Sequence, residues 1–197
     1  MSMTQWILLA AGLFVLFWAV GAYNRLVTLK NAIANAFGQI DVQLKRRHDL
    51  IPNLVEVARQ YLVHESQTLE AVIAARNQAR NAEQAAAAAP LSAQALAALA
   101  GAEQTLGAAL SKLMVVVEDY PELKADQNLR ELSEELASTE NRIGFARQAY
   151  NDQVLQFNDA ASQFPALIVA RLFGLMPQEM LASTTSEAER QPVKVQF

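Results

Sequence analysis

The sequence predicts an all-α membrane protein, in which an N-terminal transmembrane helix continues into an antiparallel, up-and-down four-helix bundle. A short C-terminal helix and a lone C-terminal strand are expected to follow the bundle. An uncharged apolar run opens the chain, and the body is rich in alanine and poor in glycine and proline. Apolar residues in the body recur every three or four positions, as helices with one buried face require.

The anchor is predicted over residues 1–24, which contain no charged side chain. Residues 6–23 form an unbroken apolar run that, at about 1.5 Å per residue, just crosses a hydrocarbon core about 30 Å thick. The rings of Trp6, Trp18 and Tyr23 lie toward the ends of this run, where they favour the headgroup region. A cleaved signal peptide is the alternative, but no basic residue precedes the run, which favours a retained anchor.

The charges that follow the span predict its orientation. Arg25 and Lys30 come directly after it, ahead of the first acidic residue, Asp41. Because basic residues are enriched on the cytoplasmic side, we expect the N-terminus outside and the helical domain in the cytoplasm. The sequence leaves the inverted topology open.

Residues 25–163 are predicted to form the bundle. The first helix is expected to end in a tight turn between residues 43 and 52, because Lys45, Arg46 and Arg47 complement a helix C-terminus and Pro52 suits a first turn. These three basic residues are a candidate anion or partner contact, although a solvated turn explains them more simply.

Three further helices complete the predicted bundle. The second, residues 49–89, would overrun the first, so it should end, bend or splay near residues 77–81. Ser92 and Asp126 are the expected caps of the third and fourth helices, and the Tyr120-Pro121 pair should separate these two helices.

The C-terminal part is predicted in two segments. Residues 164–176 should form a short apolar helix that either lies at the lipid interface or covers the open end of the bundle. Its candidate interfacial residues are Phe164, Ile168, Leu172 and Phe173. Residues 177–197 form a polar tail whose alternating Val193, Val195 and Phe197 predict a strand that docks in a groove, pairs with a second protomer or stays disordered.

No catalytic residue, metal or cofactor is expected. The chain has no cysteine, and a di-iron bundle would need two Glu-x-x-His pairs, whereas Lys45 and Tyr61 stand three residues before the two histidines, His48 and His64. Zinc-protease, phosphate-loop and serine-hydrolase motifs are missing as well. A net charge of −4 with mixed signs argues against nucleic acid as a partner.

Several polar residues fall on the apolar seams of the predicted helices: Glu65, Arg76, Glu103, Thr139 and Tyr150. They could form a buried polar site, but the favoured interpretation is a polar layer that sets the helix register or a seam position that is open to solvent. The two histidines lie among charged residues and are expected to be solvated.

Several motifs in the same order resemble the LemA family of bacterial proteins over nearly the whole chain. They are Tyr23-Asn24 after the span, residues 39–55 around Lys45-Arg46-Arg47-His48-Asp49, Glu65 with Ala75-Arg76, Tyr120-Pro121-Glu122-Leu123-Lys124-Ala125, Glu140-Asn141-Arg142-Ile143, Ala146-Arg147, Tyr150-Asn151, Phe157-Asn158, Phe164-Pro165 and Pro192-Val193-Lys194-Val195 with Phe197. The resemblance implies a single-pass protein of the bacterial inner membrane with an antiparallel helical domain, and it supplies no catalytic residue.

The expected function is a non-enzymatic, membrane-anchored scaffold that self-associates through alanine-rich helix faces and its tail. It would organise the inner membrane or proteins on it, a role that the resemblance to magnetosome-associated membrane proteins favours. Its expected partners are the lipid bilayer, other copies of the chain and other membrane proteins. The alternative is an adaptor that recognises client helices for a membrane protease or signalling system.

Overall fold

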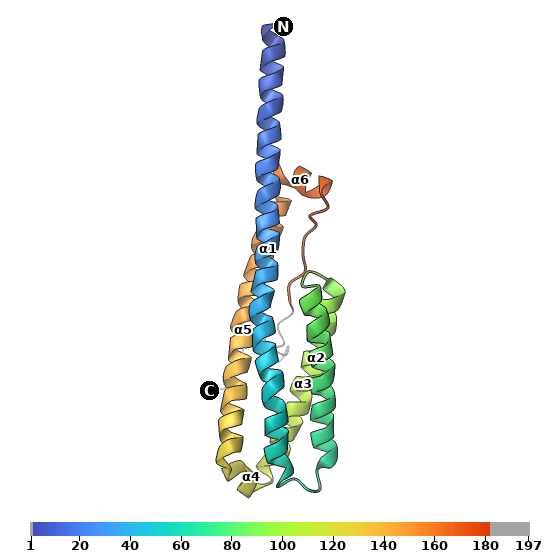
Figure 1. Ribbon diagram of the computed structural model, residues 1–197, viewed down its shortest axis with the longest axis vertical. Coiled ribbons are helices and arrows are strands. Elements are labelled where there is room, and N and C mark those ends of the chain that lie inside the picture. Colours follow the sequence, from blue (N-terminus) through green and yellow to red (C-terminus); the bar gives the residue numbers. More distant parts are fainter. Residues whose placement is uncertain (1, 182–197) are drawn as a thin grey trace, which may run out of the picture.

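The computed structural model describes residues 2–181, which form six helices and no strand (Figure 1). The helices are α1 (Met3–Arg59), α2 (Ser66–Ala88), α3 (Ala93–Glu118), α4 (Pro121–Ala125), α5 (Gln127–Ser162) and α6 (Ala166–Leu172). The all-α prediction is confirmed. The predicted lone strand is wrong, since residues 2–181 contain no strand with which one could pair. Val193, Val195 and Phe197, on which that prediction rested, lie outside the described residues.

Helix α1 runs unbroken for 57 residues, a rod about 86 Å long. Its N-terminal part projects alone beyond the bundle, and its apolar side chains are exposed (Figure 1). By length and composition this is the one helix of the described chain that could cross a membrane. Trp6, Trp18 and Tyr23 all lie on it, and Arg25 and Lys30 follow on the same rod.

The predicted turn between residues 43 and 52 is wrong, because α1 passes through Pro52 and the chain reverses only after Arg59. A proline inside a helix costs about 3 kcal/mol, since its ring nitrogen cannot donate to the carbonyl four residues earlier. That carbonyl belongs to His48, and the Nε of Arg76 on α2 donates to it at 2.9 Å.

Burial outweighs the remaining cost of the proline. Ile51 and Leu54, which flank Pro52, are completely buried. Each such side chain contributes about 1.5–3 kcal/mol when it leaves water. A turn at this place would expose both, so the helix continues.

The later turn also removes the expected break in the second helix. Helix α2 begins at Ser66 and continues through residues 77–81 to Ala88, so the predicted bend near residues 77–81 is wrong. With 23 residues, α2 is short enough to lie beside α1 and well clear of the apolar rod. No charged residue of α2 is therefore carried toward the membrane.

The bundle is packed on three of its four sides. Helix α1 packs along α5 and α2, and α2 packs along α3, whereas α3 and α5 have few close backbone approaches. The core forms two clusters, one around Phe37, Tyr150 and Phe157 and one around Leu54 and Leu113. The seam between α3 and α5 therefore stays open along part of its length.

Two helix caps that the sequence predicts are confirmed. The Ser92 hydroxyl accepts a hydrogen bond from the Ala95 amide at 3.3 Å, and the Asp126 carboxylate accepts one from the Leu129 amide at 3.0 Å. Each bond satisfies an amide that the first turn of a helix leaves without a partner. The break at Tyr120-Pro121 is also present, and there the short α4 separates α3 from α5.

After α6 the chain returns along α5 in an extended conformation. The Asn158 amide donates to the Gln178 carbonyl at 2.9 Å and accepts from the Gln178 amide at 2.8 Å. One heptad earlier on α5, Asn151 makes the same two bonds to Leu181, at 3.0 and 2.9 Å. The two asparagines thus hold the first part of the predicted polar tail against the bundle.

The core predicts a large difference between two phenylalanines of α5. Phe157→Ala should lower the free energy of unfolding by about 3–5 kcal/mol, because Phe157 is fully buried and its removal leaves a cavity. Phe145→Ala is the matched control, since Phe145 is 74% exposed, and it should change that free energy by less than about 0.5 kcal/mol. Urea unfolding of both variants in mild detergent measures the difference, and equal effects would contradict the packing described.

Candidate functional site

A cluster of charged side chains, four of them buried and one half-exposed, joins all four long helices in the middle of the bundle. We call it the charged cluster: Arg47 and His48 of α1, Glu83 of α2, Glu103 of α3 and Glu140 of α5. Consecutive helical residues point about 100° apart. Arg47 and His48 therefore point to different neighbours, and together they connect α1 with α2, α3 and α5.

The imidazole of His48 lies between two carboxylates. Its Nδ1 is 3.0 Å from Oε2 of Glu83, and its Nε2 is 2.9 Å from Oε1 of Glu103. All three side chains are at most 2% exposed. Both ring nitrogens can donate only as imidazolium, so these two bonds require either a charged His48 or a proton on one glutamate.

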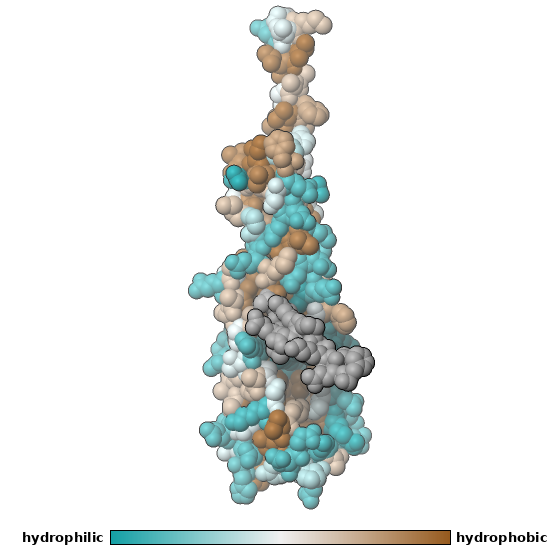
Figure 2. All heavy atoms as spheres, turned by 180° about the vertical axis from the view of Figure 1, so that it is seen from behind, coloured by the Kyte–Doolittle hydropathy of each residue, from teal (hydrophilic) through white to brown (hydrophobic). Residues whose placement is uncertain are grey.

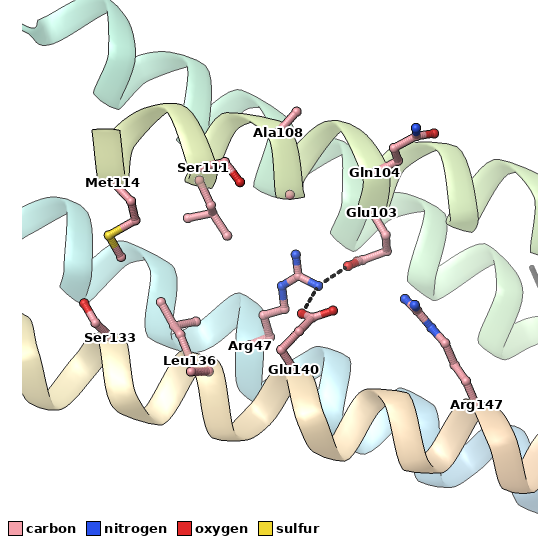
Figure 3. A pocket seen from close by; sticks show the side chains of 13 residues that line it. Arg47, Glu103, Gln104, Ala108, Ser111, Met114, Ser133, Leu136, Glu140 and Arg147 are labelled. Atoms are coloured by element: carbon pink, nitrogen blue, oxygen red, sulfur yellow. Dashed lines mark ion pairs between the residues drawn. The ribbon is translucent and has the colours of Figure 1, made fainter. Parts of the chain in front are cut away.

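Arg47 extends the charged cluster to the surface. Its Nη1 is 3.0 Å from Oε2 of Glu103 and 2.7 Å from Oε2 of Glu140 (Figure 3). Arg47 and Glu103 are buried, whereas the side chain of Glu140 is 49% exposed. Arg147 extends from α5 toward the same place (Figure 3), and burial lowers the pKa of its guanidinium while Glu140 and Glu103 oppose that shift.

Burial perturbs the carboxylate of Glu83, whose side chain is 2% exposed. Burial raises its pKa, the neighbouring Asp41 carboxylate raises it further, and the hydrogen bond with His48 opposes both effects. Lys45 lies one turn along α1 from Asp41 and pairs with it, and its Nζ is 3.9 Å from Oε1 of Glu83. The hydrogen bond that Lys45 donates to Asp41 raises the pKa of Lys45.

A groove of about 560 Å³ opens beside the charged cluster, between α3 and α5. Its walls are Gln104, Gly107, Ala108, Leu110, Ser111 and Met114 of α3 and Ser133, Leu136 and Ala137 of α5, and its charged end is formed by Arg47, Glu103, Glu140 and Arg147 (Figure 3). Small residues on both walls leave room between the helices. The groove thus offers an apolar slot with fixed charges at one end.

The structure disperses the three basic residues that were predicted to share one turn. Lys45 pairs with Asp41, Arg46 reaches Glu135 at 2.6 Å and Arg47 is buried in the charged cluster. They lie inside α1 and point to different neighbours. They therefore do not form a common anion site.

Three of the polar seam residues lie buried. Glu103 belongs to the charged cluster, the Thr139 hydroxyl donates to the Glu135 carbonyl at 2.8 Å, and the Tyr150 hydroxyl donates to the Pro90 carbonyl at 3.3 Å. Burial raises the pKa of Tyr150.

The other two seam residues lie elsewhere. Glu65 occupies the N-cap position of α2, where its side chain makes no capping hydrogen bond, and Arg76 donates to the His48 carbonyl of α1. Within residues 2–181, no three His, Asp or Glu side chains gather in a way that could hold a metal ion.

Sequence reasoning missed Glu83 and predicted a solvated His48, which is wrong. The cause is the misplaced turn, because a helix ending before Pro52 puts His48 at its exposed end. The signal was nonetheless present in the spacing of Leu44, His48, Ile51 and Val55, which continues the buried stripe through the proline.

The charged cluster predicts unequal costs for two glutamates that bind the same guanidinium. Glu103→Gln should lower the free energy of unfolding by about 3–5 kcal/mol, because it leaves the buried Arg47 guanidinium without its buried carboxylate. Glu140→Gln removes a half-exposed partner and should cost less than about 1 kcal/mol. Chemical denaturation of both variants checks this order, and a larger loss for Glu140→Gln would refute it.

A second prediction concerns pH. Because the pKa of Glu83 is raised, the folded chain keeps this proton at pH values where the unfolded chain has released it. The free energy of unfolding therefore falls as pH rises from about 4.5 to the raised pKa. Glu83→Gln should flatten this fall in a series of thermal melts, whereas Glu140→Gln should retain it. A fall as steep in Glu83→Gln as in the parent chain would rule Glu83 out as its source.

Comparison with known proteins gives two kinds of match. The chain is 31% identical over 77 residues to magnetosome protein MamQ of Magnetospirillum gryphiswaldense, a match covering 39% of this chain and 28% of that protein. It is 32% identical over 82 residues to magnetosome protein MamQ 2 of Paramagnetospirillum magneticum, a match that covers 42% of this chain and 30% of that protein. The chain thus spans less than a third of these curated relatives. The model of the LemA family matches residues 36–197, which include the whole charged cluster and the groove, and the chain belongs to this family.

Proposed function

We propose that the protein is a non-enzymatic, membrane-anchored scaffold that self-associates and organises the bacterial inner membrane or proteins on it. The observation that carries the proposal is the open seam between α3 and α5 in a bundle that is packed on its other three sides. Such a seam binds a further helical or extended segment without unfolding the bundle. The family match and the partial match to the magnetosome proteins fit a membrane-associated helical protein.

The anchor gives the scaffold a defined geometry. The apolar part of α1 and the helix that carries Arg47 and His48 are one continuous rod. Arg25 and Lys30 support an orientation with the N-terminus outside and the bundle in the cytoplasm. The groove is then presented at a distance from the bilayer that the length of the rod sets.

The chemistry of the groove suits a protein segment. Leu110, Met114 and Leu136 line it and gain from an apolar partner, while Glu140 and Arg147 at one end give the contact polarity and direction. We take a second copy of the chain as the occupant. Val115 on α3 supports this choice, because it is 67% exposed and provides apolar surface that a neighbouring copy could cover.

An adaptor for client helices is the second candidate function. The observation that favours it is the charged end of the groove, because a fixed Arg47–Glu140 pair can select one polar residue in an otherwise apolar helix. A client helix and a second copy would occupy the same groove. Identifying the occupant therefore separates the two functions.

The groove predicts that tryptophan substitutions at two exposed serines, each in the middle of a long helix, affect self-association differently. Ser111→Trp fills the groove from α3, so it should convert a discrete oligomer into monomers. Ser138→Trp places the same ring on α5 outside the groove and should leave the mass unchanged. The measurement is the protein mass by size exclusion with light scattering, on full-length protein in mild detergent.

The outcomes separate the hypotheses. A monomer in the parent chain at all concentrations would refute self-association. Photocrosslinking in cells from position 108, on the groove wall, then tests the adaptor. A specific second protein crosslinked there, and lost in Ser111→Trp, would support it, whereas crosslinks to lipid or to nothing would refute it.

A further inference from the structure

Helix α6 and the residues beside it expose an apolar surface that the bundle does not use. The exposed side chains are Phe164, Ile168, Leu172, Phe173 and Met176. Phe164 and Leu172 are 81% and 76% exposed, values that match those of the apolar rod. The space-filling view shows a hydrophobic patch beside the rod, where it leaves the bundle (Figure 2).

The other face of α6 already closes the end of the bundle. Val169 and Ala170 are buried there, and Ala170 belongs to the core cluster of Phe157. A role in covering the end of the bundle therefore explains the apolar residues on the inner face of α6, but not those on its outer face. Most of the outer face stays exposed in the described part of the chain.

The level of α6 along the rod decides what meets this outer face. The ring of Phe173 packs on that of Tyr23, with ring centroids 4.7 Å apart, and Tyr23 is the last residue of the apolar run. Helix α6 projects sideways from α1 at this level (Figure 1). If the run spans the bilayer, as the proposed function assumes, then α6 lies at the headgroup boundary.

A cavity of about 360 Å³ separates this part of α1 from the start of α6. Trp18, Gly21, Ala22, Arg25 and Leu26 of α1 line one side, and Ala160, Gln163, Phe164, Pro165 and Ala166 line the other. The lining is apolar except for the Arg25 guanidinium and the Gln163 amide. No Asp or Glu of the described chain forms an ion pair with Arg25.

We propose that this cavity is a phospholipid site, in which Arg25 binds the phosphate of an anionic bilayer lipid and the exposed face of α6 lies among the acyl chains. A guanidinium presents a planar fork of donors that matches a phosphate group, and a cation beside an anionic surface gains free energy. The apolar lining and the patch on α6 select a lipid over free phosphate, because free phosphate would leave both in contact with water.

The two tryptophans of the chain make the site measurable. Trp6→Phe leaves Trp18, which lines the cavity, as the one remaining tryptophan. The full-length variant is placed in nanodiscs of phosphatidylcholine and phosphatidylglycerol, with bromine on the acyl chains of one lipid at a time. Bromine quenches tryptophan at short range, so the ratio of quenching reports which lipid lies beside Trp18.

We expect brominated phosphatidylglycerol to bind about fivefold more strongly than phosphatidylcholine, the preference that one surface cation supplies. Arg25→Gln should abolish the preference. Lys30→Gln is the matched control: it removes a charge from the same helix outside the cavity, and it should retain the preference.

Three results would overturn the proposal. They are equal quenching by the two lipids, a preference that Arg25→Gln retains, and a preference that millimolar inorganic phosphate removes. The last would show a site for free phosphate instead of lipid.

A second measurement separates failure of this proposal from failure of the proposed function. The chain has no cysteine, so Ile168→Cys on α6 and Val15→Cys on the rod each carry one environment-sensitive fluorophore. Both labels should be dry and quenched by nitroxide lipids. A dry label at residue 15 with a wet label at residue 168 would overturn the lipid site alone, whereas two wet labels would overturn the anchor itself.

Discussion

The hydrogen bond from Arg76 to the carbonyl of His48 is a small contact on which the whole bundle depends. It satisfies the acceptor that Pro52 leaves without a donor, so α1 can continue for two further turns. Those turns bury Ile51 and Leu54 and move the reversal of the chain to residues 60–65. The length of α2 and its position beside α1 follow from this displacement.

The charged cluster lies where the four long helices meet. Its ion pairs and hydrogen bonds therefore help to fix the register of these helices, in addition to the packing of their apolar side chains. Two carboxylates and an imidazole that are nearly free of solvent can stay together only while the two hydrogen bonds of the imidazole are kept. Sliding α2 or α3 by one turn would strand Glu83 or Glu103 without His48. The cluster also defines one end of the groove, so the same residues that align the helices shape the surface that is open to a partner.

The molecule exposes two different kinds of surface at two levels along its long axis. At one end the rod and the outer face of α6 expose apolar side chains, and in the middle the groove between α3 and α5 exposes a mixture of apolar and charged groups. Because α1 is continuous, the two regions are held at a constant separation. The proposed lipid site and the proposed partner site can therefore be occupied together by one chain.

By itself, the sequence determined the elements whose signals are local. The apolar run, the caps at Ser92 and Asp126, the break at Pro121 and the apolar composition of residues 164–176 each depend on neighbouring residues, and each appears in the structure. The turn was misplaced because Pro52 has a strong local preference that a residue of another helix offsets. The charged cluster and the groove join residues up to about a hundred positions apart. Only the tertiary structure could decide them, because burial and ion pairing depend on which helices meet.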